Sequence, residues 1–107
     1  MELLKLNSAT FEEKIYDAEE NCLVVFSRKN CHVCKEVVPM IEDLADSYAD
    51  SLFNFYSVDV EEQAPLFQRF SLKGVPSVLF FSIGEYQGKI VGKIEEEQVV
   101  EKIEAIV

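Results

Sequence analysis

Two cysteines separated by two residues, Cys31 and Cys34, are the side chains in this sequence with the clearest chemistry. A thiolate can attack a disulfide or bind a metal ion. The pair follows an apolar run that ends at Phe26 and precedes a segment with helical periodicity. A helix N-terminus presents unpaired N–H groups and partial positive charge, which stabilise a thiolate. We therefore predict that Cys31 is an exposed nucleophile and that Cys34, turned inward, is the resolving thiol.

Basic residues gather around this pair in a chain whose formal net charge is −10. Arg28 and Lys29 precede the cysteines, His32 lies between them, and Lys35 follows. Nearby cations favour the ionised form of a thiol. We predict that Arg28, Lys29, His32 and the neighbouring Val33 tune the pair, although Arg28 and Lys29 also fit the description of solvated loop charges.

Two other functions of the pair are open at this point. Zinc could bind the two cysteines together with His32 and Cys22, but Cys22 lies in the middle of a predicted strand and structural zinc sites usually use a second ligand pair. A purely structural disulfide would close a very short loop and contribute little stability. We therefore predict no metal and no cofactor beyond a redox-active Cys31–Cys34 disulfide, with Cys22 a small buried apolar residue.

Length and composition indicate one globular domain spanning residues 1–107, with 49% hydrophobic and 28% charged residues. The acidic balance argues against nucleic-acid binding, which requires clustered Lys and Arg. The first residues have neither the basic nor the apolar region of a secretory signal, and no apolar run is long enough to cross a bilayer. Three cysteines fit a disulfide scaffold poorly. We expect a cytoplasmic monomer with no nucleic-acid or membrane partner.

The surrounding elements alternate between strands and helices. Apolar and β-branched runs predict strands at 3–6, 22–26, 52–60, 77–81 and 86–91. A capping box at 10–13, with Thr10 as the capping residue, predicts the start of the first helix. Further helices are predicted from the cysteine pair to Tyr48, at 64–70 and at 95–107. The resulting order is β-α-β-α-β-α-β-β-α, a mixed sheet with helices on both faces.

These features together resemble the thioredoxin family over essentially the whole chain. The matching positions are Phe26, the cysteine pair, Pro39 in the following helix, 58–60, 74–78, Gly84 and Gly92. The resemblance implies the α/β thioredoxin fold, a central mixed sheet of about five strands flanked by four helices. It also implies that Pro76 is cis and faces the cysteines, and that the backbone at Val75 binds an extended substrate. The residues alone also allow a trans proline at the start of an edge strand.

The sequence departs from the family pattern at the site itself. Asn30 stands where the family usually has an aromatic residue, and His32-Val33 replaces the usual Gly-Pro. Val25 replaces a buried acid that assists proton transfer at the inner cysteine, and Phe55 replaces a lysine near that acid. A protonated His32 would stabilise the thiolate and make the pair more oxidising. These changes suggest a dedicated partner rather than a general reductase.

The resemblance implies a protein thiol–disulfide oxidoreductase that exchanges its Cys31–Cys34 dithiol with protein disulfides. Its partners would be a protein disulfide substrate and an electron-donating reductase. One alternative is a non-catalytic binding module on the same fold, for which the missing acid and aromatic residue argue. A second alternative is the Cys/His metal-binding protein described above.

Overall fold

The computed structural model describes residues 2–107, in which five strands form one mixed sheet of order β1-β3-β2-β4-β5. The strands are β1 (Leu4–Lys5), β2 (Asn21–Ser27), β3 (Phe53–Asp59), β4 (Ser77–Ser82) and β5 (Glu85–Val91). β1, β3 and β2 run parallel, whereas β4 is antiparallel to β2 and β5 is antiparallel to β4. The parallel part and the late hairpin were both predicted from the alternation of elements.

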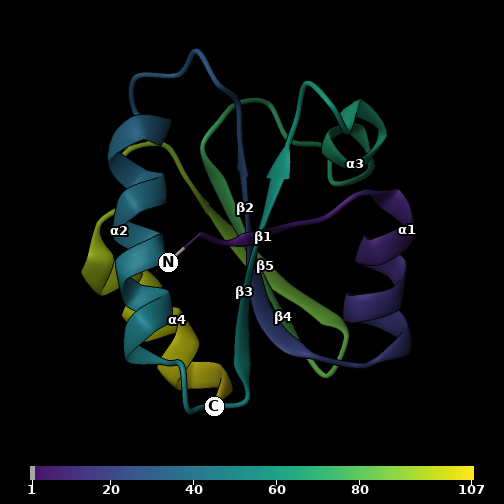
Figure 1. Cartoon of the computed structure of the whole chain (residues 1–107), viewed down its shortest axis with the longest axis vertical. Helices are drawn as coiled ribbons and strands as arrows, with labels where there is room; N and C mark the ends of the chain where they lie inside the picture. Colours follow the sequence, from purple (N-terminus) through teal and green to yellow (C-terminus); the bar gives the residue numbers. More distant parts are fainter. Residues whose placement is uncertain (1) are drawn as a thin grey trace.

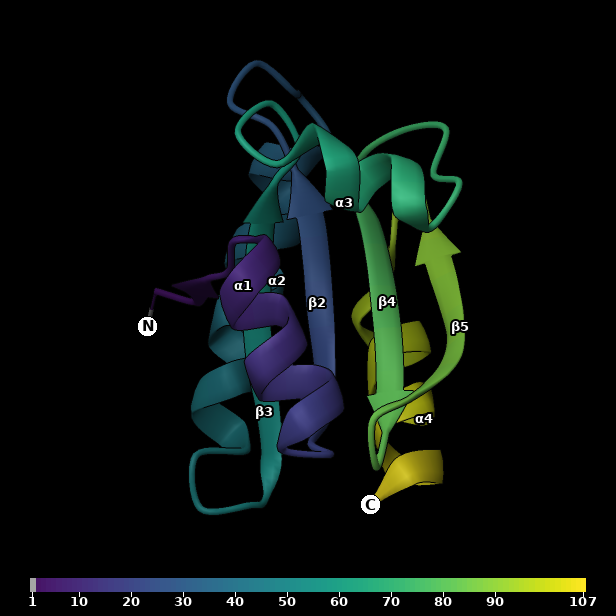
Figure 2. The ribbon, with the colours of Figure 1, turned by 90° about the vertical axis from the view of Figure 1, so that its right-hand side faces the viewer.

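Helices cover both faces of this sheet. They are α1 (Ser8–Phe11), which continues into η1 (Glu12–Asp17), then α2 (Cys34–Ser47), α3 (Ala64–Arg69) and α4 (Glu96–Ile106). With the sheet seen edge-on, α2 and α4 lie on one side and α1 and α3 on the other (Figure 1). The view turned by 90° shows α1 and α3 in front of the strands (Figure 2). The predicted element order is confirmed.

β2 lies at the centre of the sheet and is buried on both faces. Leu23 and Val25 pack in the core beneath α2 and α4, whereas Val24 and Phe26 pack in the core on the opposite side. Successive side chains of a strand point to opposite faces, so a strand covered on both sides needs an apolar residue at every position. The continuous apolar run seen in the sequence has this cause.

The first helix begins earlier than predicted. Asn7, not Thr10, is the capping residue: its Oδ1 accepts the Thr10 N–H at 2.9 Å, and Thr10 Oγ1 accepts the Asn7 N–H at 2.8 Å. Thr10 therefore occupies the third helical position of the capping box. Asn and Thr both satisfy orphan N–H groups, so the local pattern allowed either register. The following six residues widen into a π-helix, in which the Ala18 N–H donates to the Glu13 carbonyl at 3.0 Å.

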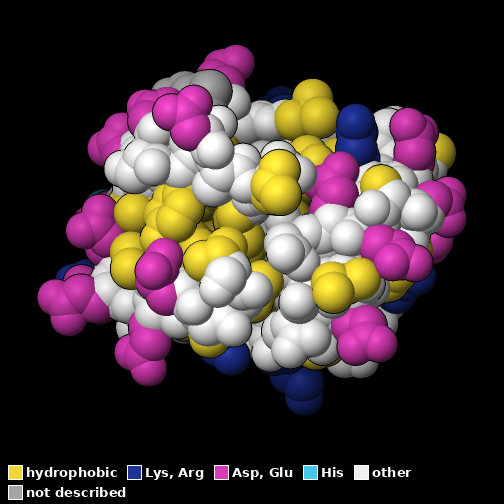
Figure 3. All heavy atoms as spheres, turned by 90° about the horizontal axis from the view of Figure 1, so that it is seen from below, with side chains coloured by type: hydrophobic (Ala, Val, Ile, Leu, Met, Phe, Trp, Pro, Cys, Tyr) yellow, Lys and Arg dark blue, Asp and Glu magenta, His cyan; other side chains and the backbone are white. Residues whose placement is uncertain are grey.

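The two ends of the molecule differ in character. Seen from below, apolar side chains gather on the surface and acidic side chains surround them (Figure 3). The most exposed large hydrophobic residues at this end are Leu52, Ile83 and Val107, which are 90%, 63% and 60% exposed. The loop between β2 and α2, which carries Cys31 and leads into Cys34, lies at the opposite end (Figure 1).

Candidate active site

The cysteine pair lies at the connection between the end of β2 and the start of α2. β2 ends at Ser27, and Cys34 is the first residue of α2. The Cα atoms of Cys31 and Cys34 are 5.2 Å apart, and their Sγ atoms are within disulfide-bonding distance. The Lys35 N–H donates to the Cys31 carbonyl at 3.2 Å and closes the turn that joins the two cysteines. The structure therefore brings the two predicted thiols together at the start of a helix.

The sulfur of Cys31 faces the positive end of α2. The backbone N–H of Cys34 donates a hydrogen bond to Cys31 Sγ at 3.1 Å. N–H groups in the first turn of a helix have no partner within the helix, and a sulfur that accepts one is stabilised most when it carries negative charge. Cys31 Sγ therefore lies where a helix N-terminus presents partial positive charge.

Cys31 is more covered than the sequence predicted. It is 7% exposed and Cys34 is 3% exposed, so both count as buried. Cys31 Sγ lies 3.9 Å from the carbonyl oxygen of Val75, in the loop that precedes β4. This loop approaches the cysteines only in the folded chain, so the spacing of the two cysteines could not reveal how far it would cover them.

The segment beside Cys31 is fixed in place. The Val75–Pro76 peptide bond is cis, the isomer that the family resemblance implies. Pro76 presents its carbonyl to the Gly92 N–H at 3.1 Å, and the Ser77 hydroxyl donates to the Gly74 carbonyl at 2.8 Å. These bonds tie both sides of Val75 to the sheet, so its carbonyl oxygen is held next to the sulfur.

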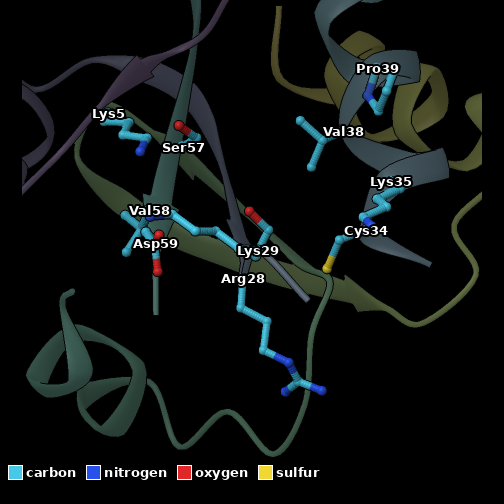
Figure 4. Close-up of a pocket in the computed structure, with 11 residues that line it drawn as sticks. Lys5, Arg28, Lys29, Cys34, Lys35, Val38, Pro39, Ser57, Val58 and Asp59 are labelled. Carbon is cyan, nitrogen blue, oxygen red and sulfur yellow. The ribbon is translucent and has the colours of Figure 1, made fainter. Parts of the chain in front are cut away.

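Three of the predicted basic residues share a cavity with Cys34. Arg28, Lys29 and Lys35 line this cavity of about 360 Å³, which opens beside the Cys34 side chain (Figure 4). His32 lies apart from it: its side chain is 92% exposed, and its Nε2 is 4.0 Å from Glu36 Oε1 on the next turn. Of the four predicted basic residues, Arg28, Lys29 and Lys35 therefore line the cavity, whereas the His32 imidazole faces solvent.

The same cavity contains two residues that sequence reasoning missed, Lys5 from β1 and Ser57 from β3. Asp59 from β3, which the sequence offered with Glu36 as a carboxylate that could serve Cys34 or merely be solvated or capping, also lines it. Asp59 is 8% exposed, and its Oδ1 accepts the backbone N–H groups of Glu61 at 2.9 Å and Glu62 at 3.4 Å. Lys5 pairs with Ser57 across parallel strands, and this register is what brings them near the cysteines. A two-residue strand gives too weak a sequence signal to predict the pairing.

The position of the absent acid is filled by apolar packing. Val25 is fully buried in the core cluster beneath α2, together with Val37 and Ile41 of that helix. Phe55, at the position of the absent lysine, packs against the same cluster. The two departures noted in the sequence thus occur together and replace a polar pair with a continuous apolar core.

Cys22 is separate from the site. It is fully buried in β2, and burial, with a smaller contribution from the charge of Glu20, raises the pKa of its thiol to about 12. Within residues 2–107, no three His, Cys, Asp or Glu side chains are grouped so that they could hold a metal ion. The set of Cys22, His32 and the paired cysteines is therefore not assembled.

A mixed five-stranded sheet with a cysteine pair at the start of its second long helix is the architecture of thioredoxin-fold proteins. A family model described as Thioredoxin matches residues 2–105, and the chain belongs to the thioredoxin family. A solved structure of a mutant thioredoxin from Halobacterium salinarum superposes with a TM-score of 0.84 at 24% identity, covering 96% of this chain and 88% of that one. This likeness confirms the fold.

Relatives of similar and of greater length are both found. Thioredoxin from Staphylococcus saprophyticus is 31% identical over 104 residues, which is 97% of each chain. Thioredoxin M-type, chloroplastic, from Pisum sativum is 27% identical over 103 residues, which is 96% of this chain and 59% of the relative. The chain thus spans little more than half the length of that chloroplast relative. Across residues 2–107, no helix is long and apolar enough to cross a membrane.

Proposed function

We propose that the protein is a thiol–disulfide oxidoreductase that reduces protein disulfides. The Cys31 thiolate attacks one sulfur of the substrate disulfide, forms a mixed disulfide and releases the first substrate thiolate. Cys34 then loses its proton and attacks Cys31 Sγ, which releases the second substrate thiolate. Two electrons pass from the Cys31–Cys34 dithiol to the substrate, and a reductase that donates two electrons restores the dithiol.

One observation carries this proposal: the hydrogen bond of 3.1 Å from the Cys34 N–H to Cys31 Sγ. It supports Cys31 as the attacking sulfur, because the helix N-terminus stabilises the negative charge that Cys31 carries before the attack. The Cα atoms of the two cysteines are only 5.2 Å apart, which keeps Cys34 within reach of Cys31 during resolution.

The proton of Cys34 cannot pass to a carboxylate at position 25, because Val25 is apolar. Cys34 lines the open cavity, so water entering there can accept the proton. A solvent acceptor makes resolution depend on the concentration of hydroxide, and the rate of the second step should rise with pH.

The segment at Val75 and Pro76 is proposed to align the substrate strand, since the Val75 carbonyl is held 3.9 Å from the attacking sulfur. The replacements at Asn30, His32 and Val33 alter the surface around the pair, which supports a dedicated protein partner. We propose a cytoplasmic monomer that carries electrons between a reductase and this partner. The free thiol of Cys22 is compatible with a reducing compartment.

The test is reduction of insulin disulfides by dithiothreitol in the presence of the protein. The parent should accelerate the reaction, whereas Cys31→Ser should be inactive and Cys34→Ser strongly impaired. Cys22→Ala serves as the matched control and should retain activity, because this thiol is buried away from the pair. A parent no faster than dithiothreitol alone would contradict the proposal and favour a non-catalytic binding module. Equilibration of the parent with glutathione buffers then measures the direction in which its electrons flow.

A further inference from the structure

The cavity beside Cys34 concentrates positive charge in an acidic protein. The chain has 10 Lys and Arg against 20 Asp and Glu. Among the described residues that line this cavity, four are basic and one is acidic: Lys5, Arg28, Lys29, Lys35 and Asp59. Four of the ten basic residues thus converge on one hollow, which reverses the charge balance of the chain as a whole.

The single acidic residue does not cancel this charge. Asp59 is mostly buried, and one of its carboxylate oxygens already accepts two backbone N–H groups. Across the cavity from it lies Cys34, with Lys29 extending between them and Arg28 pointing away from the other labelled residues (Figure 4). A carboxylate that enters the cavity beside Cys34 would therefore have Lys29 between itself and Asp59.

The basic region has a clear boundary. Lys5, Ser27, Val38 and Ser57 also line the adjoining hollow, and there the charged neighbours include Glu2 and Glu42. Acidic side chains are therefore present in the hollow that lies further from the cysteines. The charge reversal is confined to the part of the groove next to the reactive sulfurs.

The cavity also offers apolar contact. Val38, Pro39 and Val58 form part of its wall, and lysine side chains present their methylene groups to such surfaces while keeping the ammonium group in water. A Glu or Asp side chain on an extended segment matches this arrangement, with its methylene groups against the wall and its carboxylate among the ammonium groups.

We propose that this cavity binds acidic residues flanking the disulfide of the protein substrate, so that the protein selects acidic disulfide segments. This inference rests on the proposed function. Cys31 Sγ, which attacks the substrate sulfur, lies next to the Val75 carbonyl, whereas the cavity opens beside Cys34. A substrate strand passing over the pair places residues next to its cysteine within reach of the lysines. Elsewhere the acidic surface repels the same segment, which confines productive encounters to this end.

The experiment uses two synthetic peptides, each with one intramolecular disulfide, that differ only in Glu or Gln beside one cysteine. The full-length dithiol protein reduces each peptide at about 0.15 M salt, and the second-order rate constants are measured by acid quench and chromatography. Each constant is divided by that for dithiothreitol, which removes the intrinsic effect of Glu on the reactivity of the peptide disulfide. We expect the Glu peptide to be favoured about threefold to tenfold, as fits two or three partly screened charge pairs.

The variant that tests the cavity is Lys5→Glu/Lys29→Glu, and its matched control is Lys89→Glu/Lys102→Glu. The control makes the same change in net charge at β5 and α4, near the opposite edge of the sheet. The preference for Glu should vanish or reverse in the cavity variant and persist in the control. Equal rates for the two peptides with the parent, or equal loss of preference in both variants, would overturn the inference. Failure of the parent to reduce either peptide would instead refute the proposed function.

Discussion

Val25 of β2 lies directly opposite Ser57 of β3, with its own side chain fully buried and the serine beside it on the neighbouring strand. Toward the other neighbour, Val25 pairs with Val78 of β4. The position thus has apolar contacts beneath α2 and offers little to an ionised group. The absence of an acid there is consistent with the packing around it, in which Phe55 also takes part.

A buried acid should be poorly tolerated at this position. Val25→Asp is expected to lower the free energy of unfolding by about 3 kcal/mol at neutral pH, because a buried carboxylate without a partner is strongly disfavoured. Burial would raise the pKa of the introduced carboxyl above its unfolded value. The loss of stability that comes from ionising this carboxyl is then absent below about pH 4, and it grows as the pH rises toward the pKa of the carboxyl in the folded protein.

Val25→Asn is the matched control for this change, since it has similar size and no charge. Urea unfolding at pH 4 and pH 8 should show the stability gap between the Asp and Asn variants widening with pH. A gap that stays constant would mean that water or a cation reaches the position.

The roles of the two cysteines can be separated by trapping. Cys34→Ser should accumulate a mixed disulfide through Cys31 when it meets a disulfide peptide, because the attacking sulfur remains at the helix N-terminus and the resolving thiol is gone. Intact mass spectrometry measures the adduct. Cys31→Ser should yield much less of it. Equal adducts from both variants would show that Cys34 attacks as readily as Cys31.

The buried thiol of Cys22 should weaken the fold in alkali. Its folded pKa is raised to about 12, so above pH 9 the unfolded chain releases this proton while the folded chain retains it. The free energy of unfolding is therefore unaffected by this thiol below the pKa of Cys22 in the unfolded chain. Above that pH it falls by about 1.4 kcal/mol per pH unit. Urea unfolding of the oxidised protein at pH 8 and pH 10 measures the loss.

Cys22→Ala supplies the comparison and should reduce this pH dependence. Burial also raises the pKa of Tyr56, and Tyr16 and Tyr86 shift in the same direction, so the tyrosines add a further loss above pH 10 that both proteins share. If the two proteins lost stability in parallel between pH 8 and pH 10, Cys22 would not be the group responsible.

Gly84 and Gly92 allow the effect of a positive φ angle to be measured with and without a steric clash. Gly84 and Gly92 have φ angles of +75° and +85°, a region that other residues rarely adopt. A Cβ at Gly84 would lie 2.9 Å from the Ile15 carbonyl oxygen, whereas a Cβ at Gly92 would have no neighbour within 4 Å. Gly92→Ala should therefore cost about 1 kcal/mol and Gly84→Ala about 2–3 kcal/mol. Thermal unfolding measures both, and equal losses would mean that the end of η1 moves aside.

Local patterns sufficed where the cause of the structure is itself local. The continuous apolar run of β2 implied burial on both faces, and the cysteines between a strand and a helix implied a sulfur at a helix N-terminus. The start of the first helix was misplaced because Asn7 and Thr10 are both capping residues three positions apart. The residue types of η1 do not indicate that this segment forms a π-helix.

The parts of the site that could not be predicted come from distant segments. Lys5 and Ser57 reach the cavity because β1 pairs with β3 next to the cysteine loop. The covering of Cys31 depends on the loop at Val75, 44 residues further along the chain. Each depends on tertiary pairing, about which residue spacing carries little information.

The burial of Cys22 also limits how the chain can be oxidised. Three cysteines allow three intramolecular pairings, yet Cys22 lies near the start of β2 and the pair follows its end, about 17 Å of extended strand away. While the fold persists, two of those pairings are out of reach, and the enclosed thiol has no access to a second molecule. Oxidation within the native protein therefore yields a single intramolecular disulfide, Cys31–Cys34, and an isomer bridged through Cys22 would signal prior unfolding.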